Sequence, residues 1–160
     1  MEIKTGIGQD SHKFDFSRRD KKLILGGIVF SDELSLQGNS DADVILHSIT
    51  NAVSGITGVN ILGEIADEMC LGKGITDSKY YLLKAIEFLN GFKITHVSIS
   101  IECKKPIIAQ FIPKIKESIS NILSLDIKNI GITATSGEGL TSFGKGEGIQ
   151  VLSIVTAVKE

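Results

Sequence analysis

Apolar and polar side chains alternate cleanly in residues 95–103, where Val97, Ile99 and Ile101 are separated by two serines. Successive side chains of a strand point to opposite faces, so this pattern predicts a strand with one buried face. Four more strands are predicted, in residues 3–12, 23–30, 129–136 and 149–158. The Gly-Gly pair in the second predicts a kink or bulge, and the last is apolar enough to be covered on both faces.

Apolar side chains and capping residues predict three helices, at about residues 42–56, 77–90 and 106–123. Residues 39–41 (Asn-Ser-Asp) provide capping side chains before the first helix. Gly91 is a stop signal after the second helix, and Pro106 suits the start of the third.

The remaining long segments, residues 13–22 and 57–76, are predicted to be loops, the first charged and the second rich in glycine. Strands and helices follow in the mixed order β-β-α-α-β-α-β-β. This order predicts a single α+β domain over residues 1–160, with a mixed sheet and helices packed on one face. The other face would need burial, which self-association provides most simply.

The 160 residues carry a net charge of −2, with 17 basic and 19 acidic side chains. Nucleic-acid-binding domains are usually basic, so no such partner is indicated. No stretch reaches the roughly 20 apolar residues of a membrane span, and the N-terminus lacks the apolar run of a signal peptide. Cys70 and Cys103 share no Cys-x-x-Cys spacing, so we expect free thiols in a reducing cytoplasm.

Asp10 and His12 stand two residues apart on a predicted strand and therefore point to the same face. A carboxylate and an imidazole so placed could hold one divalent metal, although most such pairs are ordinary polar residues at a strand end. With a second histidine they would leave a fourth tetrahedral position open, as catalytic zinc sites do.

The second histidine would be His47. At about 100° per residue it lies nearly opposite the apolar face of its helix, which predicts that it is not a core residue. It is then either a solvated surface side chain or a ligand in a polar site, with Asp43 able to orient its ring. His96, in the alternating strand, is interpreted as structural or surface.

Residues 131–148 are rich in glycine, and Thr135 and Ser136 precede Gly-Glu-Gly. Backbone N–H groups near glycines, together with hydroxyls, can bind phosphate oxygens. Glu138 would suit a second hard cation such as Mg²⁺ that neutralises those phosphates. The alternative is a plain hairpin connection in which the glycines adopt positive φ.

Residues 103–106 (Cys-Lys-Lys-Pro) join a predicted strand end to a predicted helix start. Helix N-termini bind anions, and the two lysines would assist. The alternative is a solvated basic turn.

Three motifs occur together in one order: Asp10-x-His12, residues 40–47 (SDADVILH) and residues 134–148 (ATSGEGLTSFGKGEG). Over essentially its whole length the chain thereby resembles the 2-C-methyl-D-erythritol 2,4-cyclodiphosphate synthase family. The resemblance implies a homotrimer with active sites between subunits. It also implies Zn²⁺ held by Asp10, His12 and His47 against the β-phosphate, and Mg²⁺ or Mn²⁺ bridging the two phosphates at Glu138.

The resemblance also implies positions for the substrate. Thr135 and Ser136 match hydroxyls that position phosphates. The family's cytidine-binding loop, supplied by a neighbouring subunit, corresponds to Cys103, Lys104, Lys105 and Pro106. Further substrate-binding positions are Asn39, Ser40, Gly63 and Lys145. The last of these replaces the family's usual Arg near a central cavity thought to hold isoprenoid diphosphates.

The implied substrate is 4-diphosphocytidyl-2-C-methyl-D-erythritol 2-phosphate, an intermediate of non-mevalonate isoprenoid precursor biosynthesis. Its 2-phosphate attacks the β-phosphorus of the same molecule and expels CMP. An intramolecular attack needs alignment of the substrate more than a general base, and two cations can offset the charge of crowded phosphates.

Several residues depart from the family pattern. Asn39 replaces a usual His, Ala42 a Gly, Asn51 an Asp and Ile107 a Lys, and residues 61–70 differ from the usual loop. These changes leave the metal set complete and alter substrate contacts. Two alternatives therefore stand beside the cyclase: a non-catalytic trimer that binds an isoprenoid diphosphate or another phosphorylated ligand, and a plain metallohydrolase.

Overall fold

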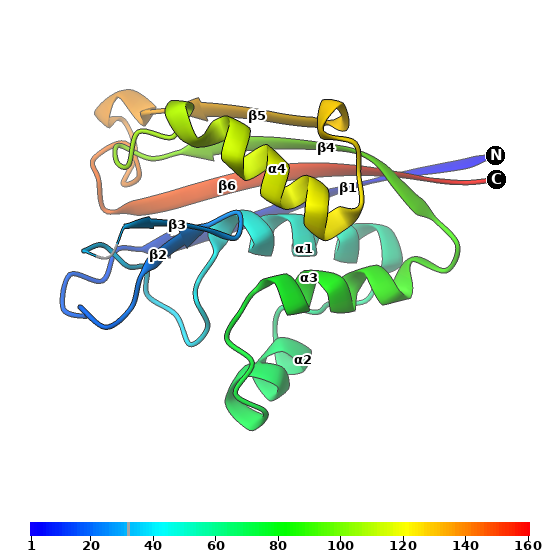
Figure 1. Cartoon of the computed structure of the whole chain (residues 1–160), viewed down its shortest axis with the longest axis horizontal. Helices are drawn as coiled ribbons and strands as arrows, with labels where there is room; N and C mark the ends of the chain where they lie inside the picture. Colours follow the sequence, from blue (N-terminus) through cyan, green and yellow to red (C-terminus); the bar gives the residue numbers. More distant parts are fainter. Residues whose placement is uncertain (32) are drawn as a thin grey trace.

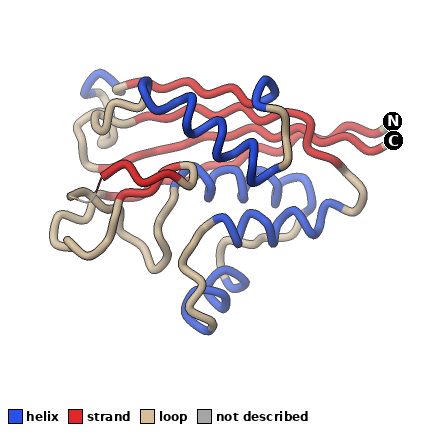
Figure 2. The backbone as a smooth tube through the Cα atoms, in the orientation of Figure 1, coloured by secondary structure: helices blue, strands red, loops and turns tan. Residues whose placement is uncertain are grey.

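The computed structural model describes residues 1–31 and 33–160, and the strands of its main sheet form a layer with the longer helices grouped on one side (Figures 1 and 2). The main sheet is mixed, because β4 and β5 are parallel and the other neighbours are antiparallel. This confirms the predicted α+β class. In spatial order its strands are β1 (Glu2–Lys13), β6 (Gly148–Lys159), β4 (Lys93–Glu102) and β5 (Ile130–Thr135).

The segment predicted as one kinked strand is instead a hairpin, so that prediction is wrong. β2 (Leu23–Leu25) pairs with β3 (Ile28–Ser31) in a separate two-stranded sheet. Gly26 and Gly27 have φ of 62° and 79°. A two-residue hairpin turn with positive φ at both positions favours glycine, so the Gly-Gly pair reverses the chain rather than bending it.

The three predicted helices are present, as α1 (Val44–Thr57), α3 (Lys79–Ile86) and α4 (Ile112–Leu123). The second helix ends at Ile86, before the predicted Asn90, and a 3-10 turn over residues 87–89 follows it. The left-handed residue that caps this turn is Asn90, with a φ of 50°, rather than the predicted Gly91. The shorter helical segments are α2 (Glu64–Asp67), η1 (Glu68–Gly72), η2 (Glu87–Leu89), η3 (Ala109–Phe111), η4 (Ile127–Asn129) and η5 (Gly137–Gly139). No helix in the described part of the chain is long and apolar enough to cross a membrane.

Two further predictions about these helical segments are wrong. The predicted loop 57–76 contains α2 and the π-helical turn η1, which were too short to show a period. The third helix begins at Ile112, so Pro113 rather than Pro106 stands in its first turn. Residues 103–106 therefore do not form a helix N-terminus, and the anion-binding argument from a helix start does not apply to them.

Helix α1 packs directly against β1 through two glycines of the strand. A Cβ at Gly8 would stand 2.0 Å from the Ser48 carbonyl oxygen, and one at Gly6 would stand 2.0 Å from that of Ala52. Ser48 and Ser153 also share a buried 2.6 Å hydrogen bond between α1 and β6. A side chain at either glycine would push the helix away. The two glycines therefore allow α1 to lie close to the part of β1 that follows them.

The opposite face of the main sheet is open in the single chain. Ile7 of β1 is 68% exposed, and its register partner Ile154 of β6 is 44% exposed. Leu152 lies on the same face and is 40% exposed. The prediction that the last strand is covered on both faces is therefore wrong for one chain. The apolar residues that suggested it form an uncovered patch, called the open face below.

The N-terminus of α1 is capped by Asp43 and not by residues 39–41. The Asp43 carboxylate is completely buried and accepts from the N–H of Leu46 at 3.1 Å. It also accepts from the N–H groups of Gly26 at 2.8 Å and Gly27 at 2.7 Å, in the turn of the β2–β3 hairpin. One side chain thus joins the helix that carries His47 to the hairpin.

Asp43→Ala is expected to destabilise the fold by about 3 kcal/mol, because it leaves buried N–H groups unpaired and removes a helix cap. For a domain of this size the melting temperature should fall by about 6–12 °C. Asp126→Ala is the matched control, since Asp126 caps η4 in an exposed position. Calorimetry that found equal losses for both variants would contradict this role of Asp43.

Candidate metal site

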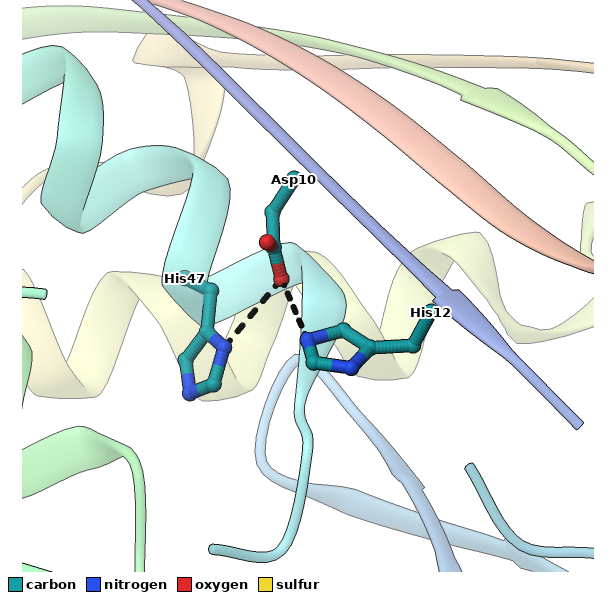
Figure 3. A group of neighbouring side chains, drawn as sticks. All are labelled: Asp10, His12 and His47. Carbon is teal, nitrogen blue, oxygen red and sulfur yellow. Dashed lines mark hydrogen bonds and ion pairs between the residues drawn. The ribbon is translucent and has the colours of Figure 1, made fainter. Parts of the chain in front are cut away.

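The three predicted metal ligands lie together. One ligand atom from each of Asp10, His12 and His47 lies within 4.8 Å of the other two. Figure 3 shows the two imidazole rings on either side of the Asp10 carboxylate, with Asp10 and His12 on β1 and His47 on α1. The period of two on β1 and the close packing of α1 on that strand produce this arrangement.

His47 is not a surface residue, because only 7% of it is exposed. The helical wheel correctly places it away from the main apolar stripe of α1. It could not show that α3 packs against that side of the helix, where Tyr81 lies with its ring centroid 6.1 Å from that of His47. The expectation of a helix face turned away from the core is therefore wrong, and His47 is a buried polar residue.

Ser78, and not Asp43, contacts the His47 ring on the side opposite Asp10. Ser78 Oγ lies 2.8 Å from His47 Nε2. Asp43 directs its carboxylate to the hairpin and to its own helix end, so the prediction that it orients the ring is wrong. On the near side, His47 Nδ1 lies 3.1 Å from Asp10 Oδ2.

The His12 ring is held in one orientation by the backbone. Its Nδ1 lies 2.7 Å from the Gln37 carbonyl oxygen, which can only accept, so Nδ1 carries the proton. Lys21 supports this segment by donating to the carbonyls of Leu36 and Gly38, which anchors one end of the predicted charged loop 13–22.

The other nitrogen of His12 is ready to bind a ligand. Nε2 is buried and lies 2.8 Å from Asp10 Oδ2, its ion-pair partner when the ring is protonated. In the neutral ring with its proton on Nδ1, the Nε2 lone pair faces that carboxylate oxygen, and a cation between the two atoms would satisfy both. Two imidazole nitrogens and one carboxylate oxygen are a donor set that suits Zn²⁺. The residues present therefore fit a divalent metal.

The charges of the cluster also suit a cation. Burial raises the pKa of Asp10, but hydrogen bonds and charge interactions with His12 and His47 outweigh it, so the pKa lies below its ordinary value of 3.8. Burial lowers the pKa of His12, but its interaction with the Asp10 carboxylate outweighs it and holds the pKa above 6.5. Asp10 is therefore ionised at neutral pH.

These shifts give opposite pH dependences with and without metal. Because the pKa of His12 is raised on folding, its charged form stabilises the metal-free fold fully below pH 6.5, and this stabilisation is lost as pH rises through the folded pKa. Because the pKa of Asp10 is lowered on folding, its ionised form stabilises the fold above pH 3.8. A metal needs neutral imidazole, so zinc stabilisation grows with pH. The zinc-induced rise in melting temperature should therefore increase between about pH 5.5 and 8. Asp10→Asn is the control, and a zinc effect independent of pH would contradict the assignment.

The metal cluster opens into a cavity of about 190 Å³. Three predicted substrate-binding residues, Asn39, Ser40 and Gly63, line it together with the metal ligands. The other lining side chains are Leu62, Ala66, Asp67 and Cys70, from the predicted loop, and Tyr81, from α3. The departures of residues 61–70 from the family loop pointed to the first four, whereas no feature of the sequence pointed to Tyr81.

The remaining predicted residues form a second group at the end of β5. The Cys103 N–H donates to the Thr135 carbonyl at 3.1 Å, which joins the two loops. Ser136 Oγ accepts from the N–H of Glu138 at 3.3 Å. Glu138 has a φ of 53° and an exposed side chain. The hydroxyls and the carboxylate that were predicted to contact phosphates and a second cation are thus adjacent.

The lysines of this second group line a cavity of their own. Lys104, Lys105 and Lys145 surround about 280 Å³ together with Phe14 and Phe16. Positive charge beside aromatic rings suits an anionic ligand with an apolar part.

The Cys103 side chain does not line this cavity. It is buried, its thiol donates to the Pro106 carbonyl at 3.5 Å, and burial raises its pKa to about 11. This thiol is neutral and inaccessible, so only the backbone of Cys103 is available for a ligand.

Thr135, at the end of β5, lies far from the metal cluster of the same chain. Across the sheet, Ser11 is aligned with Gln150, Glu102 and Thr135 in successive strands. Three strand spacings separate Ser11 from Thr135, or about 14 Å. Aligned side chains share a face, so Thr135 lies on the open face, whereas Asp10 and His12 point to the helix side.

Comparison with known proteins places the chain in a family. A family model described as the YgbB family matches residues 3–158. The chain belongs to the YgbB family. Its relatives include the 2-C-methyl-D-erythritol 2,4-cyclodiphosphate synthase of Chlamydia caviae, which is 44% identical over 160 residues. That match covers 98% of this chain and 89% of the relative.

Solved structures share the fold of this YgbB member. The bifunctional IspDF from Campylobacter jejuni matches with a TM-score of 0.87 and 30% identity, over 98% of this chain and 42% of that longer one. IspF of Plasmodium falciparum, in a CDP complex, matches with a TM-score of 0.81 and 25% identity, over 99% of this chain and 97% of that one.

Proposed function

We propose that the chain, acting as one domain over residues 1–160, is a 2-C-methyl-D-erythritol 2,4-cyclodiphosphate synthase. It would convert 4-diphosphocytidyl-2-C-methyl-D-erythritol 2-phosphate to the cyclic diphosphate and release CMP. The observation that carries the proposal is the cluster of Asp10, His12 and His47, which lines a cavity in a chain 44% identical to a relative of that name. Its two free thiols suit a cytoplasmic location.

The residues divide the task between them. Asp10, His12 and His47 would hold Zn²⁺, and Glu138 would hold Mg²⁺ or Mn²⁺. When bound, the two cations would offset negative charge on the diphosphate. Asn39 and Ser40 line the metal cavity and would orient the phosphates beside it. No described side chain has to act as nucleophile, because the attacking phosphate belongs to the substrate.

We further propose that the active unit is a homotrimer with its sites between subunits. Residues that would hold cations on the same diphosphate have to come close to one another, because a diphosphate is only a few ångströms long. Within one chain the Thr135 group is about 14 Å from β1 and faces the other side of the sheet. In the proposed trimer a neighbouring chain would therefore supply Glu138, Thr135, Ser136 and residues 103–106. The open face provides an apolar surface for that contact.

Incubation with the CDP-linked substrate, Zn²⁺ and Mg²⁺, followed by phosphorus NMR, tests the activity. We expect a cyclic diphosphate and CMP in equal amounts. Metal-loaded protein that forms no cyclic product would refute the proposal. Release of free phosphate would indicate a metallohydrolase, and ligand-induced stabilisation without turnover would indicate a non-catalytic trimer.

A further inference from the structure

We infer that Ser78 is a positioning residue for the metal site and acts together with Asp41. The chain of contacts Asp41–Ser78–His47 selects the His47 tautomer in which Nδ1 is free to bind metal. The inference rests on the metal site of the proposed function, but it does not depend on which reaction that site performs.

The hydrogen bonds around Ser78 determine the direction of each proton. Ser78 is completely buried before the first turn of α3, and its Oγ contacts both Asp41 Oδ1 and His47 Nε2. In the contact with Asp41 the Ser78 hydroxyl is the donor, and the Asp41 carboxylate also accepts from the N–H groups of Ser78 at 3.1 Å and Asp43 at 3.0 Å. The single hydroxyl proton of Ser78 therefore goes to Asp41.

Because its proton is committed to Asp41, the Ser78 hydroxyl can only accept from His47. His47 Nε2 must then carry a proton and donate it over 2.8 Å. In neutral imidazole this leaves the lone pair on Nδ1, the atom that lies 3.1 Å from Asp10 Oδ2. Metal-binding histidines commonly donate their other nitrogen to an oxygen partner, which fixes the tautomer and the ring orientation.

Loss of the hydroxyl would reverse this preference. Without Ser78 Oγ, a proton on Nε2 would be buried and unpaired, which is costly. The tautomer protonated at Nδ1 would then be favoured, because Nδ1–H could donate to Asp10. That proton occupies the position in which the metal would bind, so both His47 and Asp10 would become poorer ligands.

Three variants separate this role from general packing. Ser78→Ala removes the hydroxyl, and Ser78→Thr retains it. Ser54→Ala is the control, because it removes a different buried hydroxyl, on α1, that has no hydrogen-bond partner among the described residues. Zinc dissociation constants from competition with a chromophoric chelator should rise about 10- to 100-fold in Ser78→Ala. They should stay within about threefold of the wild type in the other two variants.

Nitrogen-15 NMR of the metal-free wild type measures the tautomer directly. We expect the neutral His47 ring to be protonated at Nε2, and in Ser78→Ala to be protonated at Nδ1. Unchanged zinc affinity in a folded Ser78→Ala variant would overturn the inference. A wild-type His47 ring protonated at Nδ1 would also overturn it. This wild-type measurement decides the question even if the Ser78→Ala variant does not fold. Both measurements use no substrate, so a failure of the cyclase assay leaves them unaffected.

Discussion

His47→Ala is expected to lower zinc affinity more than 100-fold and turnover to below about 1% of the wild type. The substitution removes one of three protein ligands, which should cost more than loss of an outer hydrogen-bond partner. It also removes the contacts that the two nitrogens of His47 make with Asp10 and Ser78 in a buried site. The metal-free fold should therefore lose about 2–3 kcal/mol, or about 4–12 °C in melting temperature.

Elemental analysis, turnover assays and calorimetry of metal-free protein would measure these three effects separately. The stability comparison must be made without metal, because zinc itself stabilises whichever form binds it. His96→Ala is the matched control, since His96 is exposed and lies outside the cluster. A His47→Ala protein that binds one zinc per chain would contradict the assignment, as would a metal-free form as stable as the wild type.

The burial of His47 illustrates how far the sequence could predict the site. The period of two on a strand put Asp10 and His12 on one face, and this needed only local geometry. The helical wheel put His47 away from the apolar stripe, which is correct for α1 alone. What covers that side is α3, more than thirty residues later, and local periodicity carries no information about such packing.

Ser78 was missed for the same reason. In the sequence it stands beside capping residues at a helix start, and serine is common there. Its contacts with Asp41 and His47 span more than thirty residues each. Its role could only emerge from the folded arrangement, in which the segment before α1 and the start of α3 meet behind the metal cluster.

The errors in the fold have equally local causes. A Gly-Gly pair inside an apolar run is compatible with a bulge or with a tight turn. Here the segments on either side of the pair, β2 and β3, bond to each other in antiparallel order, so the pair forms the turn between them. Pro106 and Pro113 stand seven residues apart, and either suits a helix start, but only Pro113 lies in the first turn of α4. The alternation of β4 needed no such context, and its apolar residues are buried as predicted.

Ile154→Lys on the open face is expected to convert a trimer into monomers and to reduce turnover more than 100-fold. Ile154 pairs with Ile7 across β1 and β6, and both are partly exposed on the open face, which the proposed trimer would cover. Burying an unpaired ammonium group in a subunit contact costs several kcal/mol, whereas in the monomer the same lysine reaches water. The substitution should therefore act on assembly and spare the fold.

Light scattering, zinc content and turnover together distinguish this result from simple unfolding. The Ile154→Lys monomer should still bind one zinc per chain, because Asp10, His12 and His47 all come from one chain. It should not turn over substrate, because Thr135 and Glu138 would no longer reach another chain's metal cavity. Val29→Lys is the matched control, since Val29 is 52% exposed on β3, outside the main sheet. An active Ile154→Lys monomer would show that one chain holds the complete site, and the trimer proposal would fail.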